Sequence, residues 1–388
     1  MVDAILSALS ALAEGARHLM SAGGPNLIMI AVAAVLFYLA IGKEVEPLLL
    51  LPIGFGCLLA NLPLSEVMDN EGVLKTLYDF GIGNELFPLL IFVGIGSMTD
   101  FSPLLANPKL LLFGAAGQLG IFLTLIVALA FGFSKEESVA VAVIGACDGP
   151  TVIYVANLFA GLQKIPTAMV GALAVAAYSY MALVPVIQPP IMRIMTTAKE
   201  RAAPMPSVKG SVSKSARIAF PIVVTVITGI IAPKGLPLMG MIMLGNFMKE
   251  SGAVTRLTKA SENEIANIST LFLGLAIGGT MNGPEFLKYE TLLVFGLGLL
   301  AIVVDTVGGI LLGKIWYLLS GGKVNPLIGA AGISAYPMAA RLVQVEGQRW
   351  NKQNFLLMHA MGANTGGQIG SVMAAAIMLS VLKGLGVI

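Results

Sequence analysis

Charged residues are scarce in this chain. Asp, Glu, Lys and Arg make up 11% of its 388 residues, whereas soluble globular domains average about 25%. Hydrophobic residues make up 57%, and the mean hydropathy is +0.89. This composition excludes a soluble domain and indicates a polytopic membrane protein. The net charge of +2 also gives no basic excess for binding nucleic acid.

Cysteine and histidine are nearly absent. Cys57 and Cys147 both lie in apolar runs, and His18 and His359 are far apart in the sequence. These four residues exclude a disulfide framework, a zinc site and a histidine-based catalytic triad. We expect no signal peptide either, because no basic segment precedes a short apolar core with a cleavage site.

Glycine (45) and proline (20) are abundant and lie inside the apolar runs, which is typical of closely packed and broken transmembrane helices. We predict an all-α fold with about 11 membrane segments. Residues 1–22 are too polar to span, and we expect either an amphipathic surface helix or a frayed terminus there. The predicted segments are residues 26–41, 47–62, 86–98, 109–131, 138–160, 168–187, 218–248, 265–281, 291–319, 326–343 and 355–385.

The two halves of the chain resemble each other. Residues 87–114 are echoed by residues 271–296, and residues 145–150 align with residues 332–337. Five segments per repeat is an odd number, so the second repeat should be inverted in the membrane. We therefore divide the chain into residues 1–45 (amphipathic segment and first helix), 46–190 (repeat 1), 191–216 (linker) and 217–388 (repeat 2).

The linker between the repeats is strongly basic. Its charged residues, with those that flank it, are Arg193, Lys199, Arg201, Lys209, Lys214 and Arg217 against Glu200 alone. The positive-inside rule predicts that this linker is cytoplasmic. With 11 segments, the N-terminus is then cytoplasmic and the C-terminus lies outside.

Asp148 is the sharpest functional candidate. It lies in an apolar run directly before Gly149 and Pro150, and proline removes a backbone donor and disfavours helix in the preceding residue. A carboxylate at a helix break in the membrane is typical of cation sites in transporters. The alternative is a structural ion pair with a lysine or arginine. Asp305 is a second mid-span carboxylate without a proline break, and we assign it no role.

A second break, residues 325–337, offers neutral oxygens from Asn325 and Ser334. Such oxygens beside unwound carbonyls suit a monovalent cation, although ordinary packing between helices is equally compatible. Arg341 follows this break on the predicted cytoplasmic side, where it holds an anionic substrate group or extends to the interface.

A third polar group lies in the last segment. Most of its polar residues share one helix face, and three glycines accompany them; the polar residues are Asn364, Thr365, Gln368 and Ser371. Ion ligation and interhelical hydrogen bonding both fit this spacing. Tyr178 and Tyr180 lie in another segment, where a tyrosine either moves a proton or anchors the helix at the interface.

Several motifs in one order resemble a known family. Asp148-Gly-Pro-Thr151, residues 177–190, the set Asn325, Gly329, Ser334 and Arg341, and residues 364–371 look like the β subunit of the biotin-dependent, sodium-pumping decarboxylases. That family comprises the oxaloacetate, methylmalonyl-CoA, glutaconyl-CoA and malonate decarboxylases. The resemblance extends from residue 43 to residue 371. The chain is shorter than the oxaloacetate-specific subunits. In its length it resembles the acyl-CoA-linked members more.

The resemblance implies a function and an elevator-like, inverted-repeat bundle in the cytoplasmic membrane of a bacterium or archaeon. A carboxyltransferase α subunit moves the substrate's carboxyl group onto biotin of a carrier subunit. The β subunit then decarboxylates carboxybiotin, consumes a proton and exports Na⁺. A small γ or δ membrane subunit, membrane lipids and further copies of the chain are the other implied partners. This chain itself carries no biotin.

The family's functional residues fall on specific positions of this chain. Asp148 and Asn364 are the implied Na⁺ ligands, and Arg341 holds carboxybiotin. Tyr180 is the implied proton relay, with Tyr178 as the alternative. Asn325 and Ser334, with Gly329, line a second Na⁺ site or the biotin pocket.

Two other classes of function remain open. A sodium-coupled carboxylate transporter would use the same repeats without chemistry. A membrane anchor for a soluble complex would need no Na⁺, and a buried Asp148 argues against it. The acyl substrate is chosen by the carboxyltransferase subunit and is not encoded here.

Overall fold

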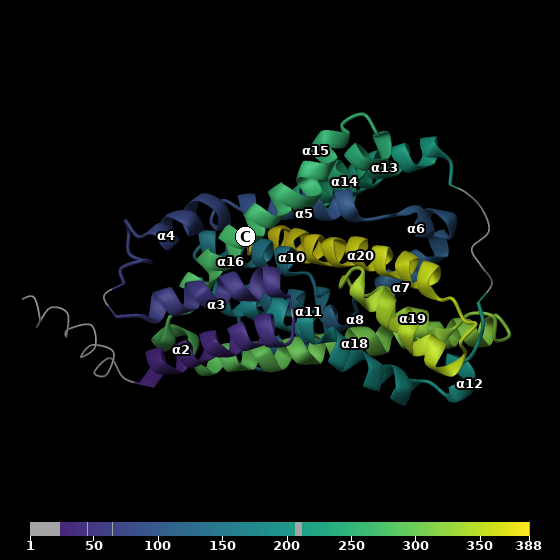
Figure 1. Cartoon of the computed structure of the whole chain (residues 1–388), viewed down its shortest axis with the longest axis horizontal. Helices are drawn as coiled ribbons and strands as arrows, with labels where there is room; N and C mark the ends of the chain where they lie inside the picture. The colour runs from purple at the N-terminus through teal and green to yellow at the C-terminus, as the bar shows by residue number, and fades with distance from the viewer. Residues whose placement is uncertain (1–23, 45, 64, 206–211, 388) are drawn as a thin grey trace, which may run out of the picture.

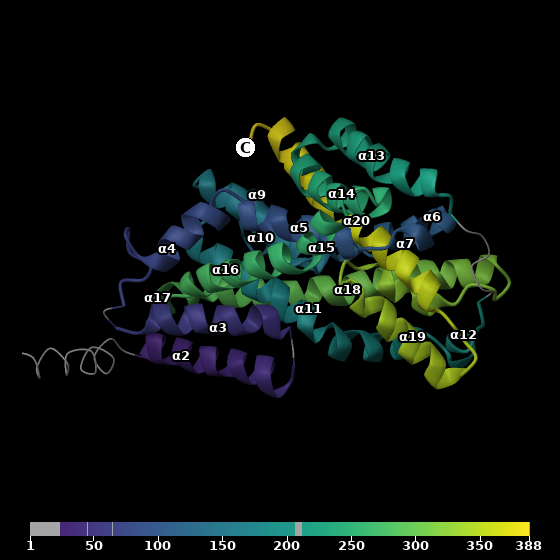
Figure 2. The same ribbon diagram turned by 45° about the horizontal axis from the view of Figure 1, so that its top comes forward.

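A computed structural model describes residues 24–44, 46–63, 65–205 and 212–387 of the chain. All regular structure in these residues is helical, which confirms the predicted all-α class. The predicted amphipathic helix at residues 1–22 lies outside the described residues. Figures 1 and 2 show an elongated bundle in which α2 and α3 form one end and α6, α12 and α19 lie toward the other.

Most helices follow the predicted segments, but the predicted segment 326–343 is wrong: it is a 3₁₀ turn over Pro326–Gly332 and a break, followed by a helix that continues to Trp350. The predicted first repeat holds α3 (Pro47–Asn61), α4 (Val73–Leu77), α5 (Leu86–Met98), α6 (Ser102–Ala106), α7 (Leu111–Ala116), α8 (Leu119–Ala130), α9 (Lys135–Ala142), α10 (Gly149–Gly161) and α11 (Thr167–Met195). α2 (Gly24–Phe37) precedes them. The later helices are α12 (Ala198–Arg201), α13 (Lys214–Ile231), α14 (Leu236–Ser251), α15 (Thr255–Ala260), α16 (Ala266–Gly279), α17 (Gly283–Phe286), α18 (Tyr289–Leu319), α19 (Met338–Trp350) and α20 (Leu357–Gly384).

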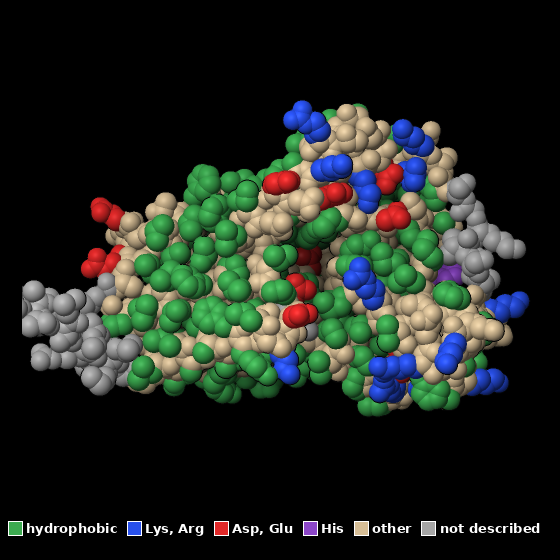
Figure 3. Space-filling view, viewed as in Figure 1, with side chains coloured by type: hydrophobic (Ala, Val, Ile, Leu, Met, Phe, Trp, Pro, Cys, Tyr) green, Lys and Arg blue, Asp and Glu red, His purple; other side chains and the backbone are tan. Residues whose placement is uncertain are grey.

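Five helices in the described residues are long and apolar enough to cross a membrane, or seven if each of two bent pairs counts as one span. Side chains of their outer faces are hydrophobic and exposed, as Leu319 (77%) and Ile230 (77%) illustrate, and Figure 3 shows broad hydrophobic areas on one face. Exposed apolar surface on this scale requires lipid. The chain is therefore a multi-pass membrane protein. The larger number, about 11 segments, also counts shorter and broken helices and stays a prediction.

Two helix pairs have exchanged partners between the two halves of the chain. α5 packs on α14, and α3 packs on α16. Glycine permits both contacts: a Cβ on Gly96 would lie 1.9 Å from the carbonyl oxygen of Ile242, and one on Gly278 would lie 2.1 Å from that of Ile53. The same exchange recurs where α11 packs on α18 and α20 packs on α7. Small residues thus bring these backbones into contact, as in other membrane bundles.

The end of the first repeat differs from the prediction in one respect. α11 continues to Met195, past residue 190, with Pro185, Pro189 and Pro190 inside it and a bend of 56° between its two parts. Pro185 and Pro190 are exposed and Pro189 is half-buried, and the bend accommodates proline rings that would clash with the preceding turn of a straight helix. The side chain of Gln188 donates to the carbonyl oxygen of Ala330 at 2.7 Å, which ties this part of α11 to the second repeat.

Candidate functional site

The first break in the bundle presents Asp148. The capping box of Ser134 and Glu137 starts α9, which ends in a 3₁₀ turn, η4 (Val143–Ala146). Cys147 then adopts the left-handed conformation with φ = 51°, which costs a non-glycine residue about 1–3 kcal/mol and is typical of functional sites. Asp148 is extended and precedes α10, whose second residue is Pro150. Proline fits there because the first helical turn needs no backbone donor.

Asp148 has no cationic partner among the described residues. Its side chain is 9% exposed, and the Thr151 hydroxyl donates to its Oδ2 atom at 2.6 Å. No lysine or arginine of the described residues forms an ion pair with it. The positive end of the α10 dipole favours a negative charge at this position. The structural alternative, an Asp148 ion pair between helices, therefore finds no support.

The second break is held in place by side-chain amides from three other elements. It begins with the 3₁₀ helix η7 (Pro326–Gly332) and ends before α19. Gln188 donates to the carbonyl of Ala330, Gln118 to that of Gly332 at 3.3 Å, and Asn364 to that of Ile333 at 2.6 Å. The amide oxygens of Gln118, Gln188 and Asn364 are buried without a hydrogen-bond partner. A buried, unpaired oxygen is costly unless an ion or water meets it.

One cavity of about 810 Å³ connects the two breaks. Asp148 and Tyr178 line it from the first repeat, and Ser334, Arg341 and Gln368 line it from the second. Figure 3 shows a hollow in the middle of the molecule with acidic side chains in it and at its rim. The volume is in the range of about 300–1,000 Å³ that binds small molecules. The cavity therefore brings a carboxylate, a phenol and a guanidinium to one space.

The two candidate tyrosines face different surroundings. Tyr178 lines the cavity, and its ring lies against Gly149, where an added Cβ would be 2.0 Å from the tyrosine Cζ. The Tyr180 hydroxyl instead donates to the carbonyl oxygen of Phe295 on α18. Tyr180 does not line the cavity. Of the two, Tyr178 has the geometry for exchanging a proton with a ligand near Asp148.

Arg341 is exposed at the cavity and forms no ion pair with a carboxylate of the described residues. It lies in the first turn of α19, directly after the second break. A guanidinium in this position has all its donors free for an anionic or carbonyl group. Extension of Arg341 into the membrane interface is equally compatible with its exposure, so its role stays a prediction.

Ser334 and Asn364 lie together, whereas Asn325 lies elsewhere. Ser334 donates to the carbonyl of Gly367 at 3.0 Å and pairs with Ser371 at 2.5 Å, so the polar face of α20 does meet the second break. Asn325 is not a cavity residue. Its amide donates to two carbonyls of the linker, and its oxygen accepts from the Leu327 amide. A Na⁺ or biotin role for Asn325 stays a prediction that these bonds disfavour.

The sequence did not single out several residues that shape the site. Gln118 interrupts an apolar segment, and this interruption is the signal that a sequence analysis can use. Glu46 and Glu262 also line the cavity, but neither lies in a recognisable motif. Tyr336, inside the second break, lines the cavity and accepts a hydrogen bond from the Asp100 amide at 3.3 Å.

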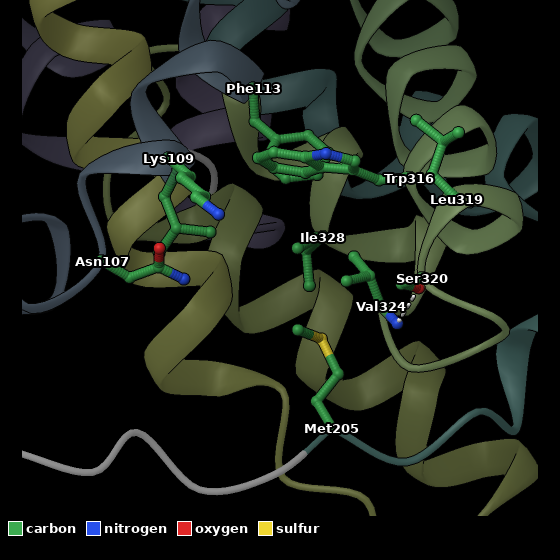
Figure 4. A pocket seen from close by; sticks show the side chains of 10 residues that line it. Asn107, Lys109, Phe113, Met205, Trp316, Leu319, Ser320, Val324 and Ile328 are labelled. Carbon is green, nitrogen blue, oxygen red and sulfur yellow. Dashed lines mark hydrogen bonds between the residues drawn. The ribbon is translucent and has the colours of Figure 1, made fainter.

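A smaller cavity of about 250 Å³ lies between the start of the 108–130 span and the end of α18 (Figure 4). The rings of Phe113 and Trp316, 4.9 Å apart, form one wall, and Lys109 lies beside them. It shares no lining residue with the larger cavity. We therefore place the site in the larger one.

These features define a class of protein. A helical membrane bundle with two breaks at one cavity, and an unpaired carboxylate at one of them, is built to handle cations. Residues 25–382 match the family model described as the Na⁺-transporting oxaloacetate decarboxylase beta subunit. The chain belongs to this family.

Curated relatives agree. The chain is similar to the methylmalonyl-CoA decarboxylase subunit beta of Veillonella parvula, with 50% identity over 358 residues, covering 92% of this chain and 93% of that protein. It is 46% identical over 383 residues to the glutaconyl-CoA decarboxylase subunit beta of Acidaminococcus fermentans, covering 99% and 100%. It is 42% identical over 435 residues to the oxaloacetate decarboxylase beta chain of Klebsiella pneumoniae, covering 96% and 99%. The predicted family and the predicted class, a membrane subunit of a sodium-pumping decarboxylase, are confirmed, and the plain carboxylate transporter is not favoured.

Proposed function

We propose that this chain decarboxylates carboxybiotin, presented by a partner subunit, and couples the reaction to Na⁺ export through Asp148. The observation that carries the proposal is the shared cavity, which joins an unpaired carboxylate to a free guanidinium and a free phenol. A transporter needs the carboxylate alone. Decarboxylation also needs a proton donor and an anion-binding group, and the phenol and the guanidinium can supply these.

Na⁺ would be bound between Asp148 and the polar face of α20. The amide oxygen of Asn364 is buried without a partner, and both η4 and α10 pack on α20. Ser334, bonded to Ser371, lies at the same junction. Oxygen ligands of this kind suit Na⁺. Ser334 would contribute either to this ion or to the biotin pocket.

The cavity fits carboxybiotin. Its volume admits the ring system of biotin, and Arg341 would orient the carboxyl group or the ring carbonyl with its free donors. Carboxybiotin supplies the carboxyl group that leaves as CO₂ and a ring atom that needs a proton afterwards.

Tyr178 would deliver that proton. Its ring contacts Gly149, directly after Asp148, and its hydroxyl forms no hydrogen bond with any described residue. The family resemblance assigns the proton relay to Tyr180, but the hydrogen bond of its hydroxyl to the Phe295 carbonyl favours Tyr178 in this role. A proton and Na⁺ would compete for Asp148, so that loading one displaces the other.

The exchanged helix pairs support two inverted repeats, about 11 segments and an elevator-like movement of one part of the bundle against the other. The N-terminus would be cytoplasmic and the C-terminus outside a bacterial or archaeal cytoplasmic membrane. As a β subunit, the chain would act with a carboxyltransferase α subunit, a biotin carrier and a small γ or δ subunit, and with other copies of itself. The chain is more similar to the methylmalonyl-CoA and glutaconyl-CoA decarboxylase relatives than to the oxaloacetate decarboxylase relative, whereas the substrate of the complex would be chosen by its carboxyltransferase subunit.

The test uses the purified complex with free carboxybiotin, with and without Na⁺, and follows CO₂ release. We expect release that depends on Na⁺. Release that is independent of Na⁺ would contradict the coupling, and no release by an intact complex that still exchanges Na⁺ would favour a transporter.

A further inference from the structure

Asp305 is the buried carboxylate that the proposed mechanism leaves unused. It lies in the middle of α18 with no exposed surface, and no lysine or arginine of the described residues pairs with it. Burying a carboxylate in a membrane helix costs free energy, so we expect specific contacts that stabilise Asp305 there.

One oxygen of Asp305 completes the broken span of residues 108–130. α8 begins after a break, and Gln118 occupies its N-cap position without capping it, because the Gln118 amide donates to carbonyls of Gly114, Gly332 and Gly367. The Gly120 amide of the first turn is bound instead by Asp305, whose Oδ1 atom accepts from it at 2.5 Å, whereas the Ile121 amide donates to the carbonyl of Gln118 at 3.2 Å. Asp305 thus acts as the helix cap from another helix.

The other oxygen lies against the turn that presents Asp148. Oδ2 has no hydrogen-bond partner, and a Cβ on Gly145 would lie 2.8 Å from it. Gly145 belongs to η4, three residues before Asp148. Both α8 and α18 pack on η4, so a carboxylate held by the Gly120 amide also limits where this turn can sit.

From these contacts we propose that Asp305 is a positioning residue for the Na⁺ site: it joins the start of α8 to the η4 turn and thereby holds Asp148 in its binding geometry. The inference rests on the proposed function, because it presumes that Asp148 binds Na⁺. Asp305 touches neither carboxybiotin nor the cavity. Its effect should therefore fall on the use of Na⁺ and spare the chemical step.

Asp305→Asn in the purified complex tests this inference. We expect the Na⁺ concentration for half-maximal CO₂ release to rise about tenfold, with the rate at saturating Na⁺ and the KM for carboxybiotin within about twofold of wild type. Thr306→Ser is the matched control, because Thr306 is the next residue and is equally buried, and serine keeps the hydroxyl that donates to the Ile302 carbonyl and accepts from Gln188. This control should leave the Na⁺ requirement unchanged. A purely structural role would lower the amount of folded complex and leave that requirement as it is.

Gly145→Ala probes the same contact from the other side and keeps the carboxylate. The added methyl group must displace Asp305 or the turn, so it should also raise the Na⁺ requirement, and the two substitutions together should do so less than additively. This variant serves if Asp305→Asn does not assemble. An unchanged Na⁺ requirement in an assembled variant refutes the inference, whereas Na⁺-independent release by the wild type refutes the proposed function itself.

Discussion

The two tyrosines of α11 allow a matched test of proton delivery. Tyr178 and Tyr180 are two residues apart, both are nearly buried, and each loses only a hydroxyl on substitution by phenylalanine. Tyr178 faces the cavity with Asp148, while the Tyr180 hydroxyl is bonded to the Phe295 carbonyl. The structure therefore separates a chemical effect from a structural one within a single helix.

The expected magnitudes differ widely. Removing a general acid typically costs a factor of about 10²–10⁴ in rate, so Tyr178→Phe should lower the rate of CO₂ release by at least about 100-fold at saturating Na⁺. Tyr180→Phe removes one internal hydrogen bond, worth about 1 kcal/mol of stability, and should keep the rate within about twofold. Single-turnover CO₂ release from carboxybiotin measures both. A large rate loss in Tyr180→Phe with a normal Tyr178→Phe would refute the reasoning and restore Tyr180 as the relay.

Two further predictions concern stability. Arg193 donates two hydrogen bonds to Glu346, beyond the predicted segment 326–343, and thereby lowers the pKa of Glu346 below its usual value near 4.5. A carboxylate whose pKa is lowered by folding stabilises the folded state at pH values above its unfolded pKa, and this contribution is lost as the pH falls through the folded pKa. Arg193→Gln should therefore lower the melting temperature at pH 7, by an amount that shrinks below about pH 4.5. A difference in melting temperature that grows on acidification would contradict this. Gly96→Ala places a Cβ against the Ile242 backbone and should cost about 1–3 kcal/mol, seen as loss of folded protein in detergent. Gly240→Ala on α14, with nothing within 4 Å, is the control and should fold normally.

Most of the fold was predictable because lipid imposes strong constraints on the sequence. Apolar runs predicted the helices, and the boundaries agree within a few residues for segments such as α5 and α18. Two exceptions are the end of α11, which continues into residues predicted as a basic linker, and α19, which continues to Trp350 beyond the predicted segment 326–343. Packing partners such as Ala330, which bonds to Gln188, keep that part of α11 helical, and a single sequence does not contain this tertiary information.

The site was predictable where an unusual residue marks it. Asp148, two residues before a proline in an apolar run, is one such unusual residue. Asn364 on the polar face of α20 is another. Asn325 shows the limit, since an asparagine at a helix break serves equally as a ligand or as a cap, and here its polar atoms are bonded to backbone. The choice between Tyr178 and Tyr180 depends on side-chain direction, which two residues on one helix do not reveal.

Asp305 illustrates a further limit. Its capping contact joins residues 185 positions apart, so nothing in its own neighbourhood in the sequence points to α8 or to Gly145. Only the folded structure brings the three elements together.

The central claim is that Asp148 couples CO₂ release to Na⁺ movement, and one measurement tests it most directly. Complex in sealed, inverted vesicles is supplied with the acyl-CoA or oxo-acid that it accepts, and radioactive Na⁺ uptake is followed together with CO₂ release. Asp148→Asn, which keeps the size of the side chain and removes its charge, should abolish both Na⁺ uptake and the Na⁺-dependent part of decarboxylation while the complex still assembles. Na⁺ uptake near the wild-type rate in this variant would contradict the account.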